Sequence, residues 1–458
     1  MMKVLLVLPP SPSALKSVLG VGGVPLGLGY IASALEHEHD VKIIDAITCD
    51  YDVRKLRDAI ERFDPDVVGV SSTTPAIYGA YDVAGLAKEV NPNCTTILGG
   101  PHPTFAAHEI MEECEYVDVV VRGEGEETIK EVVGELDGNG GGSLKEVKGI
   151  TFREGKRIID TENRPLIKNL DEVPFPAYHL MPMNSYRFGG KRFGAVITSR
   201  GCPFRCTFCS SSQLYGKTWR ARSPENIVQE LRVLTEDYGV KEIEFLDDTF
   251  TLDKNRAKKF CDMLMKEGVD ISWSCSSRVD TMDKEVAKKL KGAGCHTVYV
   301  GVESGSQRTL NLIQKGITLS QVERAIKTIK EAGLGTLCSF IIGIPGETKK
   351  AIEKTIEFAK KLSPNFAQFT ICTPFPGTRL FEMAKEKNLL LTKDWSKFTT
   401  LEPVMRVPGL SAELLKDLMK KAYIKFYLRP SFVMREIFRG RIFLIREVFS
   451  AARSILWR

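Results

Sequence analysis

Three cysteines, Cys202, Cys206 and Cys209, lie within one stretch of eight residues, whereas the other eight of the eleven cysteines are scattered along the chain. Their C-x3-C-x2-C spacing differs from the paired C-x2-C motifs of structural zinc sites. Clusters with four cysteine ligands have no vacant iron, so three thiolates would leave one iron open to another ligand. The spacing therefore favours an iron–sulfur cluster with one open corner. A zinc knuckle, the alternative, would need a fourth ligand close by, and the next cysteine is Cys261.

The length and composition of the chain indicate a globular protein with more than one domain. Its 458 residues suffice for two or three domains, and a hydrophobic content of 43% can fill sizeable cores. No run of 18 uncharged apolar residues occurs, so the sequence predicts no membrane-spanning helix. The apolar run at residues 3–9 is short for a signal peptide and is typical of a buried strand. Because scattered cysteines fit a reducing compartment, we expect a cytoplasmic protein.

The net charge of +6 is concentrated at one end of the chain. Residues 423–458 contain eight Lys or Arg and two Glu, so the remainder is neutral, which disfavours a nucleic-acid partner. Residues 431–439 and 441–457 have the pattern of two amphipathic helices in which arginines alternate with aromatic and aliphatic residues. This pattern fits peripheral contact of 431–458 with a membrane, at its inner face. A lid over the protein's own surface and an oligomer contact are the alternatives.

Residues 1–140 alternate between apolar, β-branched runs and helix-length segments. Such alternation predicts a doubly wound parallel sheet, Rossmann-like, with helices on both faces. Ligands of these sheets lie beyond the carboxyl ends of the strands, and small residues there let a large flat ligand approach the backbone. The expected strands are 3–9, 41–45, 67–73, 95–101 and 117–122, and the expected helices include 27–38, 53–63 and 77–90. A linker at 141–184 is preceded by a glycine-rich stretch from residue 134. It contains the turn sequence Glu154-Gly155, which predicts a hairpin at 150–159.

The cysteine spacing, with Phe208 directly before the last cysteine, resembles the cluster loop of the radical S-adenosylmethionine (SAM) enzymes. In that family the three cysteines hold a [4Fe–4S] cluster, and the amino and carboxylate groups of SAM bind the fourth iron. An electron from the cluster then splits SAM into methionine and a 5′-deoxyadenosyl radical. The resemblance implies that Cys202, Cys206 and Cys209 bind the cluster, that Phe208 lies beside SAM, and that an external donor of the ferredoxin or flavodoxin type supplies the electron.

Residues 185–390 again alternate between strands and helices, which by itself would allow a full TIM barrel. Six such units, with the cysteine loop after the first strand, favour the partial (β/α)6 barrel of the radical SAM enzymes. A helical region at 391–458, with a helix at 411–427, completes the chain. The expected barrel strands are 194–199, 242–246, 271–276, 297–302, 336–342 and 365–372, and the expected helices are 224–238, 256–267, 284–292, 320–332 and 348–362.

The resemblance also implies SAM contacts at successive strand ends. At the second strand Asp247 and Asp248 replace the family's Gly-Gly-Glu, and either could accept hydrogen bonds from the SAM ammonium. At the third strand Arg278 could hold the SAM carboxylate. The structural alternatives are a helix N-cap for Asp247 and an ion pair for Arg278.

At the fourth strand Glu303, followed by Ser304, could hold the ribose hydroxyls of SAM, or belong to a network inside the barrel. At the fifth strand Gly343 and Pro345 belong to a turn similar to the family's adenine-binding turn.

The first domain resembles the cobalamin-binding domain that precedes many radical SAM domains, through its element order and the stretches at 25–30 and 99–104. By this resemblance the nucleotide tail of cobalamin would pass two strand ends. The Asp-x-His-x-x-Gly motif that supplies a cobalt ligand in the cobalamin-dependent mutases and methionine synthase is absent, as it is in many radical SAM relatives, so the lower ligand stays open. His102 is either a cobalt contact or a turn residue. A flavodoxin-like domain with another ligand, or none, is the alternative. The residues implied at the strand ends are Ser71, Ser72, Thr73, Gly99 and Gly100.

These resemblances imply a cobalamin-dependent radical SAM enzyme of the class B methyltransferase type. The expected reaction is methyl transfer to an unactivated carbon: the deoxyadenosyl radical removes hydrogen and methylcobalamin donates the methyl group. The expected substrate is a small molecule of lipid, isoprenoid or tetrapyrrole-like character. A cyclase or oxidoreductase with the same cofactors, and a non-catalytic protein that binds iron–sulfur and cobalamin, are the alternatives.

Overall fold

The computed structural model describes residues 1–10, 23–138 and 143–438. The chain forms two compact units. The first comprises Met1–Pro203 with Ser210–Ile243, and the second comprises Phe204–Cys209 with the chain from Glu244 onward. The cysteine loop therefore contributes residues to both units.

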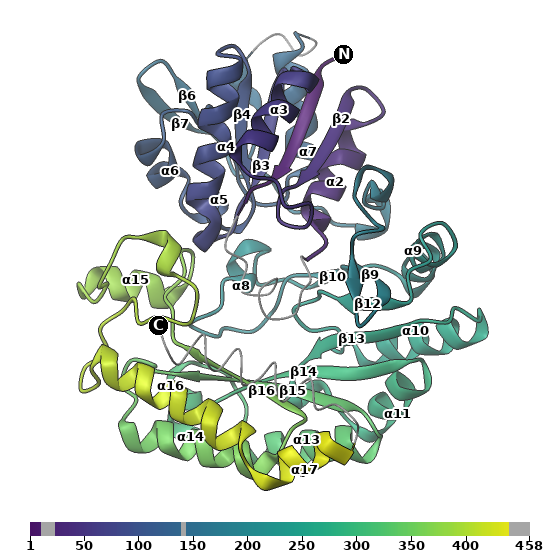
Figure 1. The fold of residues 1–458 in the computed structure, drawn as a ribbon, viewed down its shortest axis with the longest axis vertical. Helices are drawn as coiled ribbons and strands as arrows, with labels where there is room; N and C mark the ends of the chain where they lie inside the picture. The colour runs from purple at the N-terminus through teal and green to yellow at the C-terminus, as the bar shows by residue number, and fades with distance from the viewer. Residues whose placement is uncertain (11–22, 139–142, 439–458) are drawn as a thin grey trace. The chain divides into compact units, whose positions relative to one another are not determined.

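The first unit contains a seven-stranded sheet with the order β2-β1-β3-β4-β5-β6-β7 (Figure 1). Its first five strands pair in parallel, as the alternation of strands and helices predicts. The hairpin expected in the linker is present and extends this sheet, because its first strand pairs antiparallel with β5 and thereby covers the edge of that strand. The strands are β1 (Lys3–Leu8), β2 (Asp40–Asp45), β3 (Val67–Ser71), β4 (Thr95–Gly99), β5 (Val119–Val121), β6 (Ile150–Glu154) and β7 (Arg157–Asp160).

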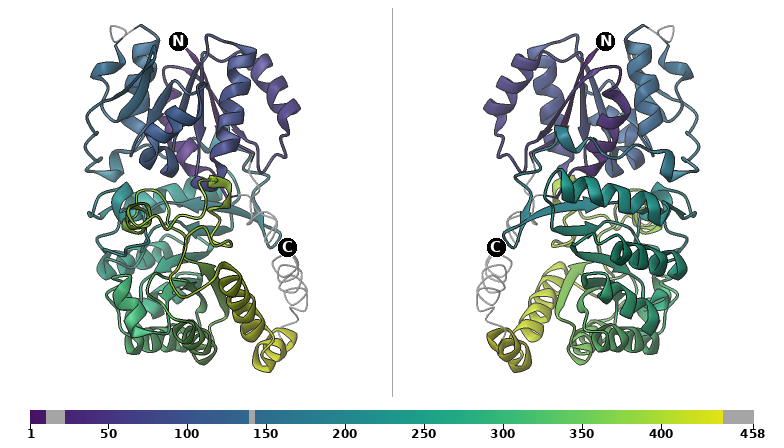
Figure 2. Two further views of the ribbon diagram at one scale, coloured as in Figure 1. Left: turned by 90° about the vertical axis from the view of Figure 1, so that its left-hand side faces the viewer. Right: turned by 90° about the vertical axis from the view of Figure 1, so that its right-hand side faces the viewer.

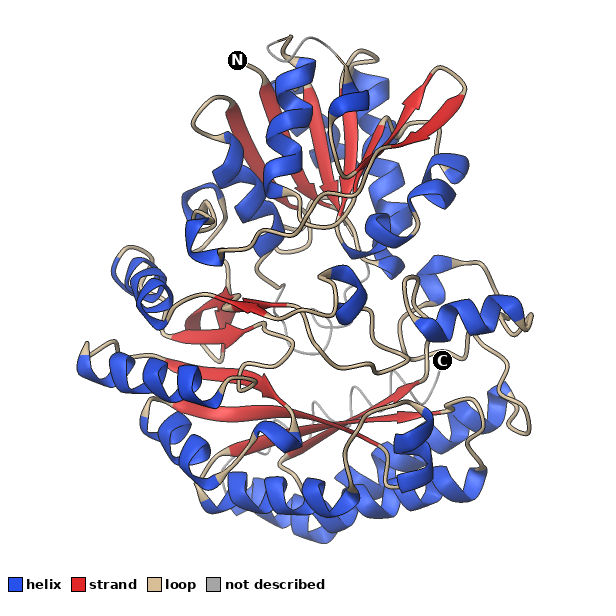
Figure 3. Ribbon diagram, turned by 180° about the vertical axis from the view of Figure 1, so that it is seen from behind, coloured by secondary structure: helices blue, strands red, loops and turns tan. Residues whose placement is uncertain are grey.

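Helices cover both faces of this sheet (Figure 3), which explains why its strands are apolar almost throughout. Val4, Leu6, Ile97 and Val119 are fully or almost fully buried in the core between the sheet and one layer of helices. The helices are α2 (Leu26–Leu35), α3 (Val53–Phe63), α4 (Ile77–Val90), α5 (Pro101–Phe105), α6 (Ala107–Glu113) and α7 (Glu126–Leu136).

A second seven-stranded sheet has the order β16-β15-β14-β13-β12-β9-β8. Its last six strands in the chain stand beside one another in chain order, which confirms the predicted partial barrel. The pairs from β13 to β16 are parallel, whereas β8 joins β9 antiparallel. The strands are β8 (Arg187–Phe188), β9 (Lys191–Val196), β12 (Glu242–Phe245), β13 (Ser272–Ser277), β14 (Cys295–Glu303), β15 (Gly335–Ile342) and β16 (Phe366–Ile371).

The helices between these strands begin at polar caps that fix their position. Asp253, Asp283, Thr318 and Thr348 each accept a hydrogen bond from the first turn of the helix that follows, and Thr318 forms a complete capping box with Gln321. The helices are α9 (Pro224–Glu236), α10 (Lys254–Lys266), α11 (Lys284–Gly292), α13 (Leu319–Glu331) and α14 (Lys349–Leu362), with the short α12 (Gln307–Leu312) and α15 (Arg379–Glu386), which the sequence pattern did not predict.

The edge strand β16 is covered by α16 (Ala412–Tyr427), the helix expected at 411–427 (Figure 2). The hydroxyl of Tyr423 donates to the carbonyl of Phe369 (3.0 Å), and the hydroxyl of Tyr427 donates to the carbonyl of Ala367 (2.8 Å). The same two hydroxyls accept the backbone N–H groups of Phe369 and Ala367. Two tyrosines thus satisfy backbone groups that an edge strand would otherwise expose.

Helix α17 (Pro430–Phe438) corresponds to the helix expected at 431–439, and Pro430 begins it, as proline can in a first helical turn. Phe432 is buried against Phe426 and Tyr427. The helix expected at 441–457 lies outside the described residues. Among the residues that the structure describes, no helix is both long enough and apolar enough to cross a membrane.

Candidate functional site

The cysteine loop begins at a sharp turn after a short two-stranded ribbon. In this ribbon β10 (Ser199–Arg200) pairs antiparallel with β11 (Arg220–Ala221). The next residue, Gly201, has a φ of +91°, and a Cβ added there would lie 2.2 Å from the carbonyl oxygen of Thr218. Only glycine therefore allows the chain to turn from the ribbon toward Cys202.

Three half-buried cysteine side chains that form no disulfide follow this turn, those of Cys202, Cys206 and Cys209. Thiolates are the ligands that iron–sulfur clusters require, and three of them on one loop fit the predicted cluster with an open iron. Within 1–10, 23–138 and 143–438, no three His, Cys, Asp or Glu side chains are grouped so as to hold a single metal ion. Phe208 is half-buried beside the last cysteine.

The ribbon before the loop is fixed by a buried network of ion pairs within the first unit. The Arg200 guanidinium donates to Glu124 (2.8 Å) and to Glu126 (2.5 Å), and Arg220 also donates to Glu124 (2.9 Å). Burial by itself would raise the pKa of Glu124, but the two guanidiniums outweigh it and hold that pKa below its ordinary value. Both glutamates follow β5, so the end of that strand anchors the entrance to the cysteine loop.

Within the second unit, the cysteine loop is held by backbone hydrogen bonds and by a cation. The N–H of Thr207 donates to the carbonyl of Ile313, and the carbonyl of Thr207 accepts the N–H of Leu380, each at 3.0 Å. The Arg278 guanidinium lies over the ring of Phe204, 3.5 Å from its centre. These contacts bring the loop against residues that follow β13 and α12.

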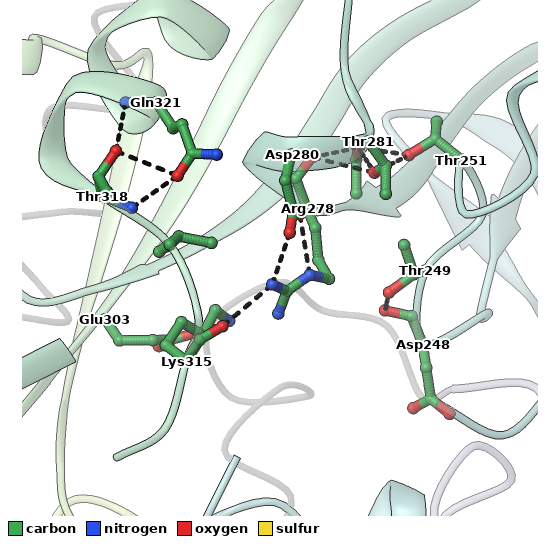
Figure 4. A network of polar contacts seen from close by, with 12 residues as sticks. Asp248, Thr249, Thr251, Arg278, Asp280, Thr281, Glu303, Lys315, Thr318 and Gln321 are labelled. Atoms are coloured by element: carbon green, nitrogen blue, oxygen red, sulfur yellow. Dashed lines mark hydrogen bonds and ion pairs between the residues drawn. The ribbon is translucent and has the colours of Figure 1, made fainter. Parts of the chain in front are cut away.

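Arg278 and Glu303, both expected at strand ends, are each engaged in an ion pair (Figure 4). Arg278 donates to Asp280 through Nε (3.0 Å) and Nη2 (2.9 Å), and also to the carbonyl of Lys315 (3.0 Å). The buried ammonium of Lys315 donates to Glu303 at 2.6 Å. The structural contacts considered for Arg278 and Glu303 are therefore present, and their contacts with SAM stay predictions.

The side chains expected at two other strand ends differ in their exposure to solvent. Asp247 is buried and Asp248 is exposed after β12, and the cap of the next helix is Asp253, so the N-cap alternative for Asp247 is wrong. Ser304 is fully buried and its hydroxyl lies 3.0 Å from that of Thr355, inside the barrel wall.

The turn after β15 is closed by a carboxylate that sequence reasoning did not single out. Gly343 has a φ of +78°, and its N–H and that of Ile344 both donate to Glu347, at 2.9 and 3.2 Å. Burial raises the pKa of Glu347 to about 7. Pro345 is half-buried in the same turn. The turn is thus held in shape from inside by one buried carboxyl group.

In the first unit, the ends of β3 and β4 form a narrow cradle. Ser71 and Gly99 are in register, and the N–H of Ser72 donates to the carbonyl of Gly99 at 2.9 Å. Gly100 has a φ of +103°, and a Cβ there would lie 2.8 Å from the carbonyl oxygen of Ser72 and 3.1 Å from the hydroxyl of Ser71. Thr73 is exposed beside them. Backbone at this place can therefore be approached closely by a ligand, which fits the predicted cobalamin tail.

His102 is not a turn residue, because it lies in α5 and is almost fully buried. Its Nδ1 is 3.2 Å from the hydroxyl of Thr74. Burial lowers the pKa of His102 to about 4, so the imidazole is neutral near pH 7.

Comparison with known proteins gives two family matches, in successive parts of the sequence. The family model of the B12 binding domain matches residues 12–133, and that of the Radical SAM superfamily matches residues 196–359. An uncharacterized methyltransferase of Pyrococcus horikoshii is 52% identical over 99% of this chain and 98% of its own length. The chain belongs to the cobalamin-dependent radical SAM enzymes.

Two further relatives agree with this assignment. The anaerobic magnesium-protoporphyrin IX monomethyl ester cyclase of Cereibacter sphaeroides is 30% identical, over 94% of this chain and 71% of its own. The radical SAM methyltransferase TsrM of Kitasatospora setae, solved with cobalamin and a [4Fe–4S] cluster bound, has the same fold, with a TM-score of 0.73 at 17% identity over 94% of this chain and 89% of that one. This radical SAM enzyme therefore has SAM, a [4Fe–4S] cluster and cobalamin as its cofactors.

Sequence reasoning missed two groups of charged residues in this enzyme, one that holds the ribbon before the cysteine loop in the first unit and one in the second unit. Glu124, Glu126 and Lys315 stand in no motif that indicates their partners, because each pairs with a residue distant in the sequence. One signal was available: the glutamates belong to the turn sequence that ends β5, where functional residues of open parallel sheets gather.

Proposed function

We propose that this enzyme transfers a methyl group to a carbon that carries no acidic proton. The observation that carries the proposal is the similarity to a methyltransferase at 52% identity, which spans almost all of both chains. The methyltransferase whose fold it shares supports the same reaction class. When bound, the cofactors supply a radical that can remove hydrogen from such a carbon and a methyl group to replace it.

The chain itself would bind, orient and shield these cofactors. Cys202, Cys206 and Cys209 would hold the cluster, and the cradle at Ser72 and Gly100 would receive the cobalamin tail. We assign residues 1–140 to the cobalamin domain, 141–184 to the linker, 185–390 to the radical SAM domain and 391–458 to the helical end.

SAM would lie along the strand ends of the barrel, where Phe208 follows the cluster loop. Asp247 or Asp248 would accept its ammonium, Arg278 would meet its carboxylate, and Glu303 with Ser304 would face its ribose. The turn that contains Gly343 and Pro345 would receive the adenine. Glu347 supports this turn from behind, since both of its backbone donors belong to the turn.

For the substrate we favour a lipid, isoprenoid or tetrapyrrole-like molecule. The relative from Cereibacter sphaeroides acts, by its name, on a magnesium porphyrin ester. On the helical end, Ile424, Leu428, Met434 and Ile437 are large apolar side chains with exposed fractions of 42–50%. These residues precede the basic tail, so peripheral contact with an anionic membrane, at its inner face, is part of the proposal.

The second candidate is cyclisation or oxidation with the same cofactors, and the name of that same relative favours it. Mass spectrometry separates the two reactions, because methylation adds one CH2 to the product, whereas ring formation removes hydrogen.

The test is anaerobic reconstitution with iron, sulfide and cobalamin, followed by incubation of the reduced protein with trideuteromethyl SAM and extracts of cells that lack the gene. Incorporation of a deuterated methyl group into an extract component would support the proposal. Formation of 5′-deoxyadenosine with an unlabelled, dehydrogenated product would favour the second candidate. Absence of 5′-deoxyadenosine would favour a non-catalytic binding protein.

The matched control replaces the three loop cysteines with alanine, one at a time. Each variant should lose the brown cluster chromophore and SAM cleavage but keep cobalamin, because the cradle lies in another part of the chain. Substitution of Cys261, which is buried in the barrel core, should leave the chromophore intact.

A further inference from the structure

Lys315 is a buried lysine to which neither the motifs nor the comparisons give a role. Its side chain is 9% exposed and its ammonium lies 2.6 Å from the carboxylate of Glu303, whose side chain is 7% exposed. Burial by itself would lower the pKa of Lys315, but Glu303 outweighs it and raises that pKa, so the side chain is charged. A charged group in such a place is costly unless it compensates another charge.

The surrounding backbone is shaped to hold this pair at the strand end. Glu303 ends β14 with a φ of +64°, a conformation that non-glycine residues rarely adopt, and the pairing of β14 with β15 is irregular between Gly301 and Glu303. A Cβ at Gly301 would lie 2.4 Å from Oε1 of Glu303 and 2.8 Å from Nζ of Lys315. The pair therefore occupies space that a side chain at Gly301 would fill. Unusual backbone of this kind is concentrated at functional sites.

The segment that carries Lys315 is joined to the cysteine loop at two points. The carbonyl of Ile313 accepts the N–H of Thr207, which stands between Cys206 and Cys209. The carbonyl of Lys315 accepts a hydrogen bond from Arg278, whose guanidinium covers Phe204 of the same loop. Figure 4 shows Lys315 beside Glu303 and the hydrogen bond that joins Lys315 to the Arg278 guanidinium.

These contacts hold the segment of the buried ion pair against the cysteine loop, through the backbone of Thr207 and through the guanidinium of Arg278.

We infer that Lys315 is an electrostatic partner of the [4Fe–4S] cluster, whose buried ammonium, held by Glu303, stabilises the reduced cluster and so raises its reduction potential. A four-iron cube on three thiolates carries one net negative charge when oxidised and two when reduced. A nearby cation therefore favours the reduced form, and net charge is among the factors that set cluster potentials. The inference rests on the cluster alone and holds whichever substrate the enzyme uses.

The experiment is a redox titration of the reconstituted protein, without SAM or substrate, followed by electron paramagnetic resonance of the reduced cluster. The variants are K315M, K315R and the double variant K315M/E303Q. The double variant removes both charges of the buried pair, so it can still be measured if K315M fails to fold because the charge of Glu303 is left unpaired. The matched control is K330M, since the ammonium of Lys330 is partly buried in the same unit but donates to the carbonyl of Leu362. Iron content and melting temperature are measured for each protein.

We expect the reduced-to-oxidised ratio at a fixed ambient potential to fall about tenfold in K315M and in the double variant, which is about 59 mV for a one-electron couple. K315R and K330M should stay within about twofold of the wild type, a change of about 18 mV by the same conversion.

Unchanged potentials in both neutral variants would overturn the inference. The inference would also be overturned if the potentials were unchanged and SAM no longer altered the electron paramagnetic resonance spectrum of the cluster. Lys315 would then hold the SAM carboxylate instead. Failure of a folded double variant to take up iron, while K315R takes it up, would also overturn it, since Lys315 would then be needed for assembly.

Discussion

The buried ion pairs at the entrance to the cysteine loop give the sharpest prediction for stability. Glu124 accepts from Arg200 (2.8 Å), from Arg220 (2.9 Å) and from the N–H of Ile167 (2.8 Å), and its side chain is only 4% exposed. Glu124→Gln keeps the shape and can still accept hydrogen bonds, but it removes the charge that the two arginines share. Arg200 would keep Glu126 as an ion-pair partner, whereas Arg220 would lose the carboxylate of Glu124.

The magnitude follows from the burial of the network. Removal of one partner from a buried ion pair costs about 3–5 kcal/mol. Because Glu126 continues to compensate Arg200, we expect the lower end, about 3 kcal/mol. A unit of this size loses about 2–4 °C of melting temperature per kcal/mol, so the first unit should melt about 6–12 °C earlier.

The assay is calorimetry of the cofactor-free protein at pH 7, with Glu131→Gln as the control. Glu131 also pairs with an arginine of the same unit, Arg164, but its side chain is 47% exposed. Exposed ion pairs contribute at most about 1 kcal/mol to the free energy of unfolding, so the melting temperature of the control variant should fall by less than about 4 °C. Equal shifts in the two variants would refute the reasoning.

The dependence on pH provides a second check of the same prediction. The pKa of Glu124 is lowered in the folded protein, so its stabilisation is present above the unfolded-state value of about 4.3 and is lost as pH falls through the folded-state value. The gap in melting temperature between wild type and Glu124→Gln should therefore narrow in acid. A gap that stayed constant down to pH 3 would mean that shape, and not charge, carries the effect.

Three further predictions address the other parts of the site. Gly100→Ala places a methyl group 2.8 Å from the carbonyl oxygen of Ser72. The amount of cobalamin that this variant retains after desalting should fall at least tenfold, while its iron content stays unchanged. The control Gly134→Ala, whose methyl group meets no atom within 4 Å, should retain all of its cobalamin. Burial raises the pKa of Glu347 to about 7. The free energy of unfolding should therefore fall by about 3 kcal/mol as pH rises from about 4.3 to above 7. Urea titrations at pH 5 and pH 8 should show this fall in the wild type but not in Glu347→Gln. Removal of residues 439–458 should abolish co-sedimentation with anionic liposomes but not cluster content, and equal sedimentation of both proteins would end the membrane proposal.

Local sequence predicted most elements of this fold, and their boundaries are correct where local chemistry sets them. Residues 53–63, 77–90 and 284–292 are helices with the predicted ends. Two of them begin at an aspartate whose side chain accepts from the first turn, and such a cap depends on neighbours in the chain alone. The strands could also be predicted from their apolar sequences, because a sheet that is covered on both faces requires apolar strands.

The positions of the charged side chains could not be read in this way. The chain order does not say that Glu124 would meet Arg200, or that Lys315 would meet Glu303 across Gly301, because each contact depends on which strand ends and loops become neighbours. The N-cap alternative for Asp247 and the turn assigned to His102 were wrong for the same reason. Each is a buried residue whose surroundings come from distant segments.

The sequence by itself determined the chemistry of this protein: three thiolates at fixed spacing, and two series of strands and helices whose periodicity specifies an open sheet and a partial barrel. Spacing and periodicity are local properties, so they can be determined from the amino-acid sequence alone. The tertiary structure alone decided the electrostatic setting of those thiolates, because charges act through space, and folding brings Arg278, Lys315 and Glu303 to the loop from three different strand ends and turns.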